Sequence, residues 1–302
     1  MWFWLSSAAL LCWSGSDLFS KIGCGDENDR YAHLKMLTAV GLVMGLHAAA
    51  EIAFGGVKLN ASVIVTYLPV SALYIISMAI GYLGLKYIEL SILSPICNSS
   101  GAIVAILILA TRGLGELPIS ALLAVALVCI GVTALGFTEA NEDPELRDKR
   151  QTEGSRKYTK SVLAILLPII YCLLDALGTF ADARILEQLD EASANVAYEL
   201  TFFTVGLVCA VIVFGVKKQK PVIKHDAPKL IAAVFETGGQ LAYIYALADT
   251  AHAALTAPVI SSYCVMSVVW SRIFLKEKLS KKHYISIALM VAGIIILGIL
   301  DI

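Results

Sequence analysis

Charged residues are scarce in this chain of 302 residues: Lys, Arg, Asp and Glu make up 16% of it, against 58% hydrophobic residues. The formal net charge is −1, so the sequence lacks the excess of positive charge that a nucleic-acid partner would require. Its mean hydropathy of +0.79 is above what a soluble globular domain tolerates. The scarcity of charge therefore excludes an ordinary soluble protein and indicates one embedded in a lipid bilayer.

Sequence motifs of catalysis and metal binding are missing as well. The sequence contains no HExxH or GxSxG pattern and no Walker loop. Its seven cysteines form no CxxC pair, so free buried thiols are expected. We predict no enzyme activity, no ATP-driven pumping by this chain alone, no cofactor and no metal site. The few histidines lie mostly near the ends of apolar segments: His33, His47, His225, His252 and His283.

Ten apolar segments have about the length of a membrane-spanning helix. Helices are expected because open strands cannot satisfy their backbone groups in lipid, and the alternation typical of an outer-membrane barrel is absent. The first segment lacks a basic region before it and contains Asp17 and Lys21 near its end, so we predict a retained helix rather than a signal peptide. The predicted spans are 2–20, 33–54, 62–85, 90–111, 119–137, 161–181, 195–216, 229–248, 253–274 and 283–300.

The second half of the chain repeats the first. Residues 82–137 and 245–299 share the order of their aromatic, Pro, Ser and Gly positions, so that Pro95 corresponds to Pro258. In membrane proteins such duplications usually flank a transport pathway. We predict one five-helix repeat at 1–138, a polar cytoplasmic linker at 139–160, and a second repeat at 161–302. This organisation indicates a carrier.

The placement of basic residues predicts the orientation in the membrane. Of the 23 Lys and Arg residues, 20 lie in or beside the loops after the odd-numbered spans. Positive residues are retained in the cytoplasm, so both termini are predicted outside the cell membrane. Five helices per repeat then invert one repeat relative to the other. The predicted fold class is an all-α membrane protein with ten transmembrane helices as two inverted five-helix repeats.

Several motifs in the second half resemble those of EamA-type carriers of the drug/metabolite transporter superfamily. They are the Tyr-Ala-Leu turn at 245–247, the Ala-Ala-Leu-Thr-Ala-Pro stretch at 253–258, the Lys-Glu-Lys-Leu-Ser turn at 276–280, and the Ala292-Gly293 to Gly298 end of the last span. In the first half the family's acidic turn is replaced by the displaced segment 111–116. The resemblance implies a central cavity walled by helices 1 to 4 and 6 to 9, with helices 5 and 10 outside and alternating access.

Acidic residues within the apolar segments indicate what the carrier binds. Each buried charge costs roughly 2.5 to 3.5 kcal/mol on membrane-insertion scales, so such residues tend to face a cavity or a partner. Asp17, Asp175, Glu199 and Glu236 lie inside or near the mid-depth of predicted spans, whereas Arg184 and Arg272 lie near helix ends and no Lys or Arg lies at comparable depth. Asp175 shares a helical face with Tyr171, Gly178 and Asp182.

Acids and aromatic rings around one cavity suit a cation, through charge and through cation–π contacts of about 0.5 to 2 kcal/mol. We therefore predict a cationic or zwitterionic amine as the substrate. Export or facilitated passage of neutral amino acids or other metabolites is the alternative. The predicted substrate-binding residues are Trp13, Asp17, Tyr171, Asp175, Glu199, Glu236, Gln240, Tyr243, Tyr263 and Trp270.

Asp17, Asp175 and Glu236 are also candidates for carrying a coupling proton. A carboxyl in a partly dry cavity can take a proton from one face of the membrane and release it at the other. Pro95 and Pro258 each remove a backbone hydrogen bond at equivalent positions and are predicted hinges.

Structural interpretations of the polar residues stay open. Asp17 and Asp175 would then be held by neighbouring Ser and Tyr hydroxyls or by Lys21 and Arg184, and Glu199 would be hydrated near the membrane boundary. His47 would form an interfacial ion pair with Glu51. Tyr67 and Tyr74 are interpreted as packing or interfacial rings. Small residues at Gly41, Gly45, Gly131 and Gly293 predict close helix packing.

A non-transporting membrane scaffold or receptor is the second functional class. It predicts no internal symmetry and usually a sizeable domain outside the membrane, and the sequence fits neither. The expected partners are a small-molecule substrate, the lipid bilayer and a proton as candidate coupling ion. The chain is expected to act as a monomer or a homodimer.

Overall fold

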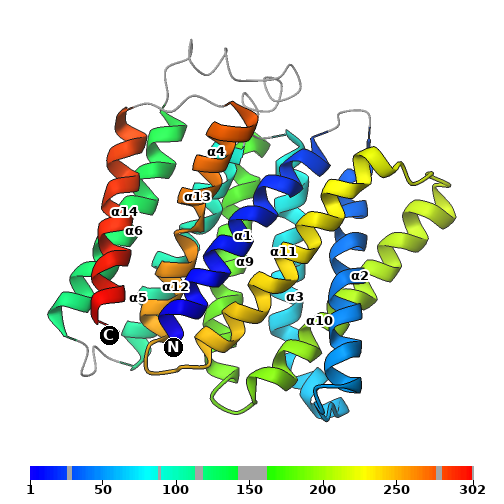
Figure 1. Ribbon diagram of the computed structural model, residues 1–302, viewed down its shortest axis with the longest axis horizontal. Coiled ribbons are helices and arrows are strands. Elements are labelled where there is room, and N and C mark those ends of the chain that lie inside the picture. Colours follow the sequence, from blue (N-terminus) through cyan, green and yellow to red (C-terminus); the bar gives the residue numbers. More distant parts are fainter. Residues whose placement is uncertain (26–28, 88–89, 113–117, 142–161, 277–280, 301–302) are drawn as a thin grey trace.

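A computed structural model describes residues 1–25, 29–87, 90–112, 118–141, 162–276 and 281–300 (Figure 1). Every regular element in these ranges is helical, which confirms the predicted all-α class for the described part of the chain. Figure 1 places both termini at the same end of the helical bundle. Beyond Asn141 the predicted linker lies outside the described residues, as do the displaced segment at 113–116 and the turn at 277–280.

The five spans predicted in the first half correspond to six helices because the fourth span is divided. The first, α1, already contains the acid Asp17, and α3 contains Pro69. The helices are α1 (Trp2–Cys24), α2 (Ala32–Ala53), α3 (Ala61–Tyr87), α4 (Leu90–Asn98), α5 (Ser100–Arg112) and α6 (Ile119–Ala140).

The second half is divided at the corresponding place, in its fourth span. Asp190 caps the start of α10, since its carboxylate accepts a hydrogen bond of 2.8 Å from the backbone N–H of Ser193. The elements are α9 (Val162–Ile185), α10 (Glu191–Ala210) with the π-helical η1 (Val211–Val216), α11 (Ile223–Leu247), α12 (Ala253–Ser261), α13 (Tyr263–Trp270) with the π-helical η2 (Ser271–Leu275), and α14 (Lys281–Leu300).

Seven helices of the described residues are long and apolar enough to cross a membrane. These correspond to the second to fourth and the sixth to ninth predicted spans. Residues 119–134 and 284–297 form shorter apolar helices, and the first predicted span coincides with α1. A multi-pass membrane protein follows from these spans.

Both divided spans are interrupted four residues after a proline, at Ser99 after Pro95 and at Ser262 after Pro258. The Ser99 hydroxyl donates to the carbonyl of Pro95 at 3.1 Å, and that of Ser262 donates to the carbonyl of Val259. Such bonds compete with the helical backbone ladder and bend helices. The predicted hinge prolines therefore lie one turn before the actual interruptions, and hinge motion itself stays a prediction.

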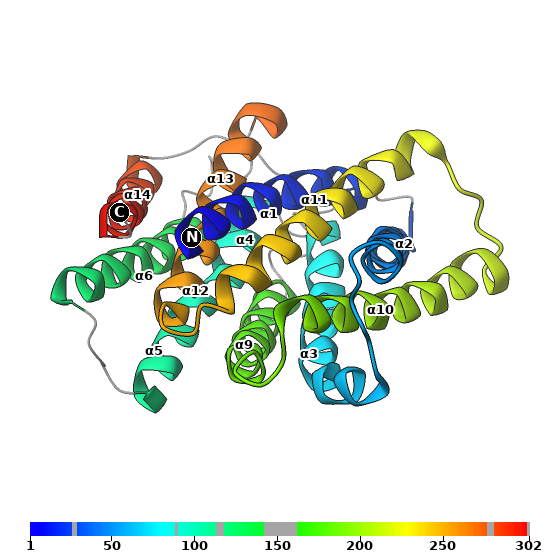
Figure 2. The same cartoon turned by 60° about the horizontal axis from the view of Figure 1, so that its bottom comes forward.

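Helices from opposite halves of the chain are packed together. The first helix α1 lies along α11, α3 lies along α9, and α2 lies along α10. At one edge of the bundle α6 and α14 lie side by side, and both views show this pair outside the other helices (Figures 1 and 2).

Glycines permit the closest of these contacts, as the sequence predicts. A Cβ atom added at Gly41 would lie 2.9 Å from the Cα of Gly206, and one added at Gly293 would lie 2.7 Å from the carbonyl oxygen of Ala124. Gly131 meets the backbone of Ser286 in the same way. The distances at Gly41 and Gly293 are shorter than a Cβ atom tolerates, so the predicted close helix packing at these glycines is confirmed.

Candidate functional site

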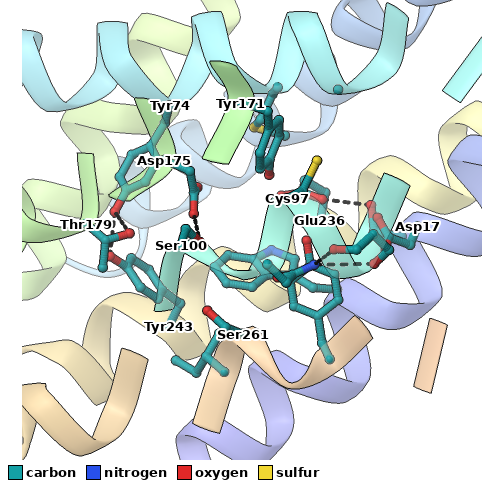
Figure 3. Close-up of a pocket in the computed structure, with 18 of the residues that line it drawn as sticks. Asp17, Tyr74, Cys97, Ser100, Tyr171, Asp175, Thr179, Glu236, Tyr243 and Ser261 are labelled. Atoms are coloured by element: carbon teal, nitrogen blue, oxygen red, sulfur yellow. Dashed lines mark hydrogen bonds between the residues drawn. The ribbon is translucent and has the colours of Figure 1, made fainter. Parts of the chain in front are cut away.

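A cavity of about 90 Å³ lies among the helices, lined from α1, α3, α4, α5, α9, α10, α11, α12 and α13 (Figure 3). The helix α2 and the edge pair α6 and α14 contribute no side chain to its described lining. One water molecule needs about 10 to 15 Å³ of such volume, so the cavity has room for several waters or a small organic solute.

Asp17 lies on the α1 wall of this cavity. The serine hydroxyls of Ser94 and Ser267 donate to its Oδ2 at 2.6 and 2.8 Å. These serines come from the first and the second half of the chain, so one carboxylate links α1 to α4 and to α13. Asp17 is thus both a lining residue and a structural connection between helices, and its role in binding stays a prediction.

The other two cavity acids are held in a similar way. Ser100 donates to Asp175 Oδ2 at 2.7 Å, and Ser16 donates to Glu236 Oε2 at 2.7 Å. Figure 3 shows Asp175 pointing toward Ser100 at one side of the cavity, with Glu236 and Asp17 at the other. Each carboxylate has about four acceptor positions, so one serine bond leaves capacity for a ligand.

Aromatic rings occupy the space between these acids. The Trp13 ring lies 5.2 Å from that of Tyr243 and 5.9 Å from that of Tyr263, measured between centroids, and Tyr171 lines the cavity beside Asp175. The described lining contains three carboxylic acids and no Lys, Arg or His. Acids and rings without a competing cation form an environment that attracts a positive charge.

Eight of the ten predicted binding residues line this cavity: Trp13, Asp17, Tyr171, Asp175, Glu236, Gln240, Tyr243 and Tyr263. Glu199 and Trp270 do not. The Trp270 indole donates to Ser14 Oγ at 3.1 Å, and Glu199 bonds to His47 Nδ1 at 2.9 Å and to Asn195 at 3.0 Å. His47 lies 3.8 Å from Glu51, so its shorter contact is with Glu199 rather than with the predicted partner.

The two tyrosines interpreted as packing or interfacial rings are both buried in the hydrophobic core, which fits the packing interpretation and not the interfacial one. Tyr67 is fully buried and donates to Asp182 at 2.7 Å, while Tyr74 lines the cavity and its hydroxyl lies 2.5 Å from that of Tyr243. Thr179 accepts from Tyr74 at 3.0 Å. The sequence shows these hydroxyls on helical faces, but only the structure brings α3, α9 and α11 together.

Basic side chains gather at the end of the bundle opposite the termini. Lys35 pairs with Asp29 at 2.8 Å and Lys229 pairs with Asp226 at 3.0 Å, and both lysines are buried. Lys21 donates to the carbonyl of Leu85 at 2.8 Å. The Lys21 contact joins α1 to α3 near the predicted cytoplasmic face, and Lys229 of α11 also lies 3.9 Å from Asp29, the partner of Lys35 on α2. None of these lysines is in the described cavity lining. Among the described residues, no three His, Cys, Asp or Glu side chains are grouped to hold a metal ion.

Apolar spans packed around a polar cavity define a multi-pass membrane protein with an internal binding space. Residues 162–299, in the second half of the chain, match the EamA-like transporter family, and this match supports the resemblance to EamA-type carriers of the drug/metabolite transporter superfamily. The proteins of that family are membrane transporters of small solutes rather than enzymes.

Two further comparisons bear on the fold and on function. A solved crystal structure, whose description names only a protein, is similar to this chain with a TM-score of 0.65 and 14% sequence identity. The similarity covers 98% of this chain and 96% of the chain in that structure. This likeness shows a shared fold over the whole chain, including the first half that the family match does not cover. The curated proteins give no match to the sequence.

Proposed function

We propose that this protein is a secondary transporter that binds a small cationic or zwitterionic amine in the central cavity. The observation that carries the proposal is the lining itself, in which Asp17, Asp175 and Glu236 surround aromatic rings and no basic side chain is present in the described part. A cation between these carboxylates gains charge–charge attraction that water screens little in a partly enclosed site.

Alternating access through ten spans in two inverted repeats is the second part of the proposal. The packing supports it. If the repeats correspond, α1 is equivalent to α9 and α3 is equivalent to α11, so the contact between α1 and α11 should have an equivalent between α9 and α3. Both contacts are present. The pairs α2 with α10 and α6 with α14 are each converted into themselves. Interruptions at Ser99 and Ser262 give equivalent places in the two halves at which a span could bend.

Coupling to protons is the third part, with the three cavity acids as the groups that accept them. When a cation and a proton compete for one carboxylate, binding of one releases the other, and this competition alone exchanges protons for the cation across the membrane. The chain would lie in the cell membrane with both termini outside, as a monomer or homodimer. Transport of neutral amino acids or other metabolites, and a scaffold or receptor role, are the alternatives.

A binding screen on the purified protein tests the substrate class. Choline, spermidine, glycine and succinate would each be added to detergent-solubilised protein, and the melting temperature measured. We expect the cations to raise it, because a ligand that binds only the folded state stabilises it by RT ln(1 + [L]/Kd). Stabilisation by succinate alone contradicts the proposal, and stabilisation by glycine alone favours the neutral alternative.

A matched variant shows whether stabilisation comes from the cavity. Asp175→Asn keeps the size of the side chain and removes its charge, whereas Asp249→Asn does the same to a partly exposed acid that pairs with His252 at the turn before α12. The cation effect should disappear in the first variant and persist in the second. Flux of the stabilising compound into proteoliposomes, with no change in its covalent structure, then separates a carrier from a receptor.

A further inference from the structure

Asp182 on α9 is a buried acid that the cavity does not use. It follows Asp175 by seven residues on the same helical face, toward the end of the bundle where the termini lie. Its side chain is fully buried and is not part of the described cavity lining. Tyr67 donates to its Oδ1 at 2.7 Å and Tyr74 to its Oδ2 at 3.5 Å.

The hydroxyl of Tyr74 connects this acid to the cavity. It lies 2.5 Å from the hydroxyl of Tyr243 and donates to Thr179 at 3.0 Å, and all three of these side chains line the cavity. Figure 3 shows Tyr74, Thr179 and Tyr243 grouped at the side of the cavity where Asp175 lies. A phenol both donates and accepts, so Tyr243 and Tyr74 form an unbroken hydroxyl pair between cavity water and Asp182.

The surroundings of Asp182 suit a group that alternates between neutral and charged forms. The polar groups that act on Asp182 are Tyr67 and Tyr74 from α3, Tyr243 from α11 and Tyr198 from α10, and Thr179 lies one turn before it on its own helix. The Arg184 guanidinium is partly exposed and contacts Glu187 at 3.6 Å and the Phe180 ring at 5.6 Å. A carboxylate surrounded by phenols rather than cations is costly to keep charged in a bilayer and readily takes a proton.

We propose that Asp182 is a proton-binding site that exchanges protons with the central cavity through the Tyr74–Tyr243 hydroxyl pair. It gives the coupling proton a route toward the end of the protein that carries the termini. The O–H bond of Tyr74 breaks as an O–H bond forms on the Asp182 carboxylate, and the Tyr74 oxygen takes the proton of Tyr243. The Tyr243 oxygen is then reprotonated by a hydronium ion in the cavity, which leaves a neutral water there, so neither phenol retains a charge.

The same geometry explains how the step is controlled. The Tyr74 hydroxyl has two acceptors, Thr179 at 3.0 Å and Asp182 at 3.5 Å, so a small rotation of the phenol exchanges a resting bond for the transferring one. Because α3, α9 and α11 carry the three side chains, relative movement of these helices makes or breaks the connection. The proposal rests on the proton coupling proposed above and specifies its route.

The test separates proton-driven uptake from exchange in proteoliposomes that contain the full chain. The probes are radiolabelled choline, spermidine and tetraethylammonium, supplied either with an imposed pH gradient or against an equal internal concentration of the unlabelled compound. Asp182→Asn and Tyr74→Phe should lower gradient-driven uptake by at least about tenfold, since positioned proton transfer typically contributes more than this. Exchange moves no net proton and should stay within about twofold of the parent rate in Asp182→Asn, whose side chain is outside the described cavity lining. Tyr74 lines the cavity, so for Tyr74→Phe the measured quantity is the ratio of gradient-driven uptake to exchange, which should fall.

Tyr245→Phe is the matched control. Tyr245 lies two residues after Tyr243 on α11, but it is partly exposed and is not part of the described cavity lining. This variant should keep gradient-driven uptake, and Asp182→Glu should restore part of it. Equal loss of uptake and exchange in both test variants would show a structural role and overturn the proposal, as would full uptake by Asp182→Asn. A parent protein that exchanges the probes without responding to pH overturns the coupling and the route together, and a parent that moves none of them overturns the substrate class as well.

Discussion

At the scale of single residues, serine hydroxyls decide how acids are kept inside an apolar bundle. Ser16, Ser94, Ser100 and Ser267 each donate one hydrogen bond to a cavity carboxylate. A hydroxyl lowers the cost of burying the acid and leaves its charge in place, whereas a lysine would neutralise that charge. The charge is therefore still available to a ligand, which a salt bridge would have consumed.

Removing the charge of one cavity acid should weaken cation binding. In Asp175→Asn and Glu236→Gln the serine partner keeps an acceptor, so the fold should persist. Loss of a charged hydrogen bond costs about 1.5 to 3 kcal/mol, equivalent to a roughly ten- to hundredfold weaker affinity. Equilibrium binding of the cation selected by the screen measures the loss, with Asp249→Asn as the unaffected control. Unchanged affinity in both cavity variants would leave these acids with a structural role alone.

At the scale of secondary structure, the sequence predicted helices and their apolar faces well, and their partners poorly. The stripe of Tyr171 and Asp175 lines the cavity as predicted by its spacing of four residues. Glu199 was predicted to bind substrate because it lies within an apolar span, but that pattern does not show which neighbouring helix its side chain meets. The structure places Tyr198 in the lining and turns Glu199 toward His47 on α2.

Contacts between distant parts of the chain mark the limit of prediction from one sequence. The pair of His47 and Glu199 is separated by 152 residues, and the bond from Tyr67 to Asp182 spans 115. Nothing in local spacing links such residues. The glycine positions were predictable because close approach leaves a local mark, the absence of a side chain on one helical face. The identity of the helix approached at Gly41, which is α10, was not.

Two glycine-to-alanine substitutions test the packing of α2 against α10. A Cβ atom at Gly206 would lie 3.0 Å from the Cα of Gly41 and 3.1 Å from the carbonyl oxygen of Leu37, and backbone atoms cannot move aside locally. Overpacking of this kind costs about 1 to 3 kcal/mol. At Gly238 the added atom meets only Cys12 Sγ, at 3.7 Å, an ordinary contact.

Gly206→Ala should therefore lower the melting temperature of the purified protein, while Gly238→Ala should leave it unchanged or raise it. Alanine is favoured over glycine in a helix by roughly 1 kcal/mol, and this gain applies equally to both positions. The difference between the two variants thus isolates the contact between helices. Equal melting temperatures would mean that α2 and α10 are not packed this closely in the membrane.

At the scale of the whole molecule, charge is sorted into three levels along the bundle axis. Buried lysines with acid partners lie at the end opposite the termini, serine-held acids line the central cavity, and Asp182 with its tyrosines lies nearer the termini. A proton or cation crossing the bundle would meet these levels in sequence. The order gives the two ends different chemistry, although the helices that build them are paired symmetrically.

The basic residues predict the orientation of this arrangement in the membrane, and the orientation can be measured directly. Asn60 is exposed between α2 and α3, and Gln219 is exposed between η1 and α11, so the two positions lie in loops predicted on opposite sides of the membrane. With 20 of the 23 Lys and Arg residues assigned to the cytoplasmic side, retention of positive charge places Gln219 inside and Asn60 outside.

Each residue would be replaced by Cys, and intact cells treated with a membrane-impermeant thiol reagent. Asn60→Cys should react, whereas Gln219→Cys should react only after the cells are opened. The parent chain, whose seven cysteines are buried or only partly exposed, supplies the background. Reaction of Gln219→Cys in intact cells would reverse the predicted orientation, and reaction of both would show that the two loops lie on one side and that the count of spans between them is wrong.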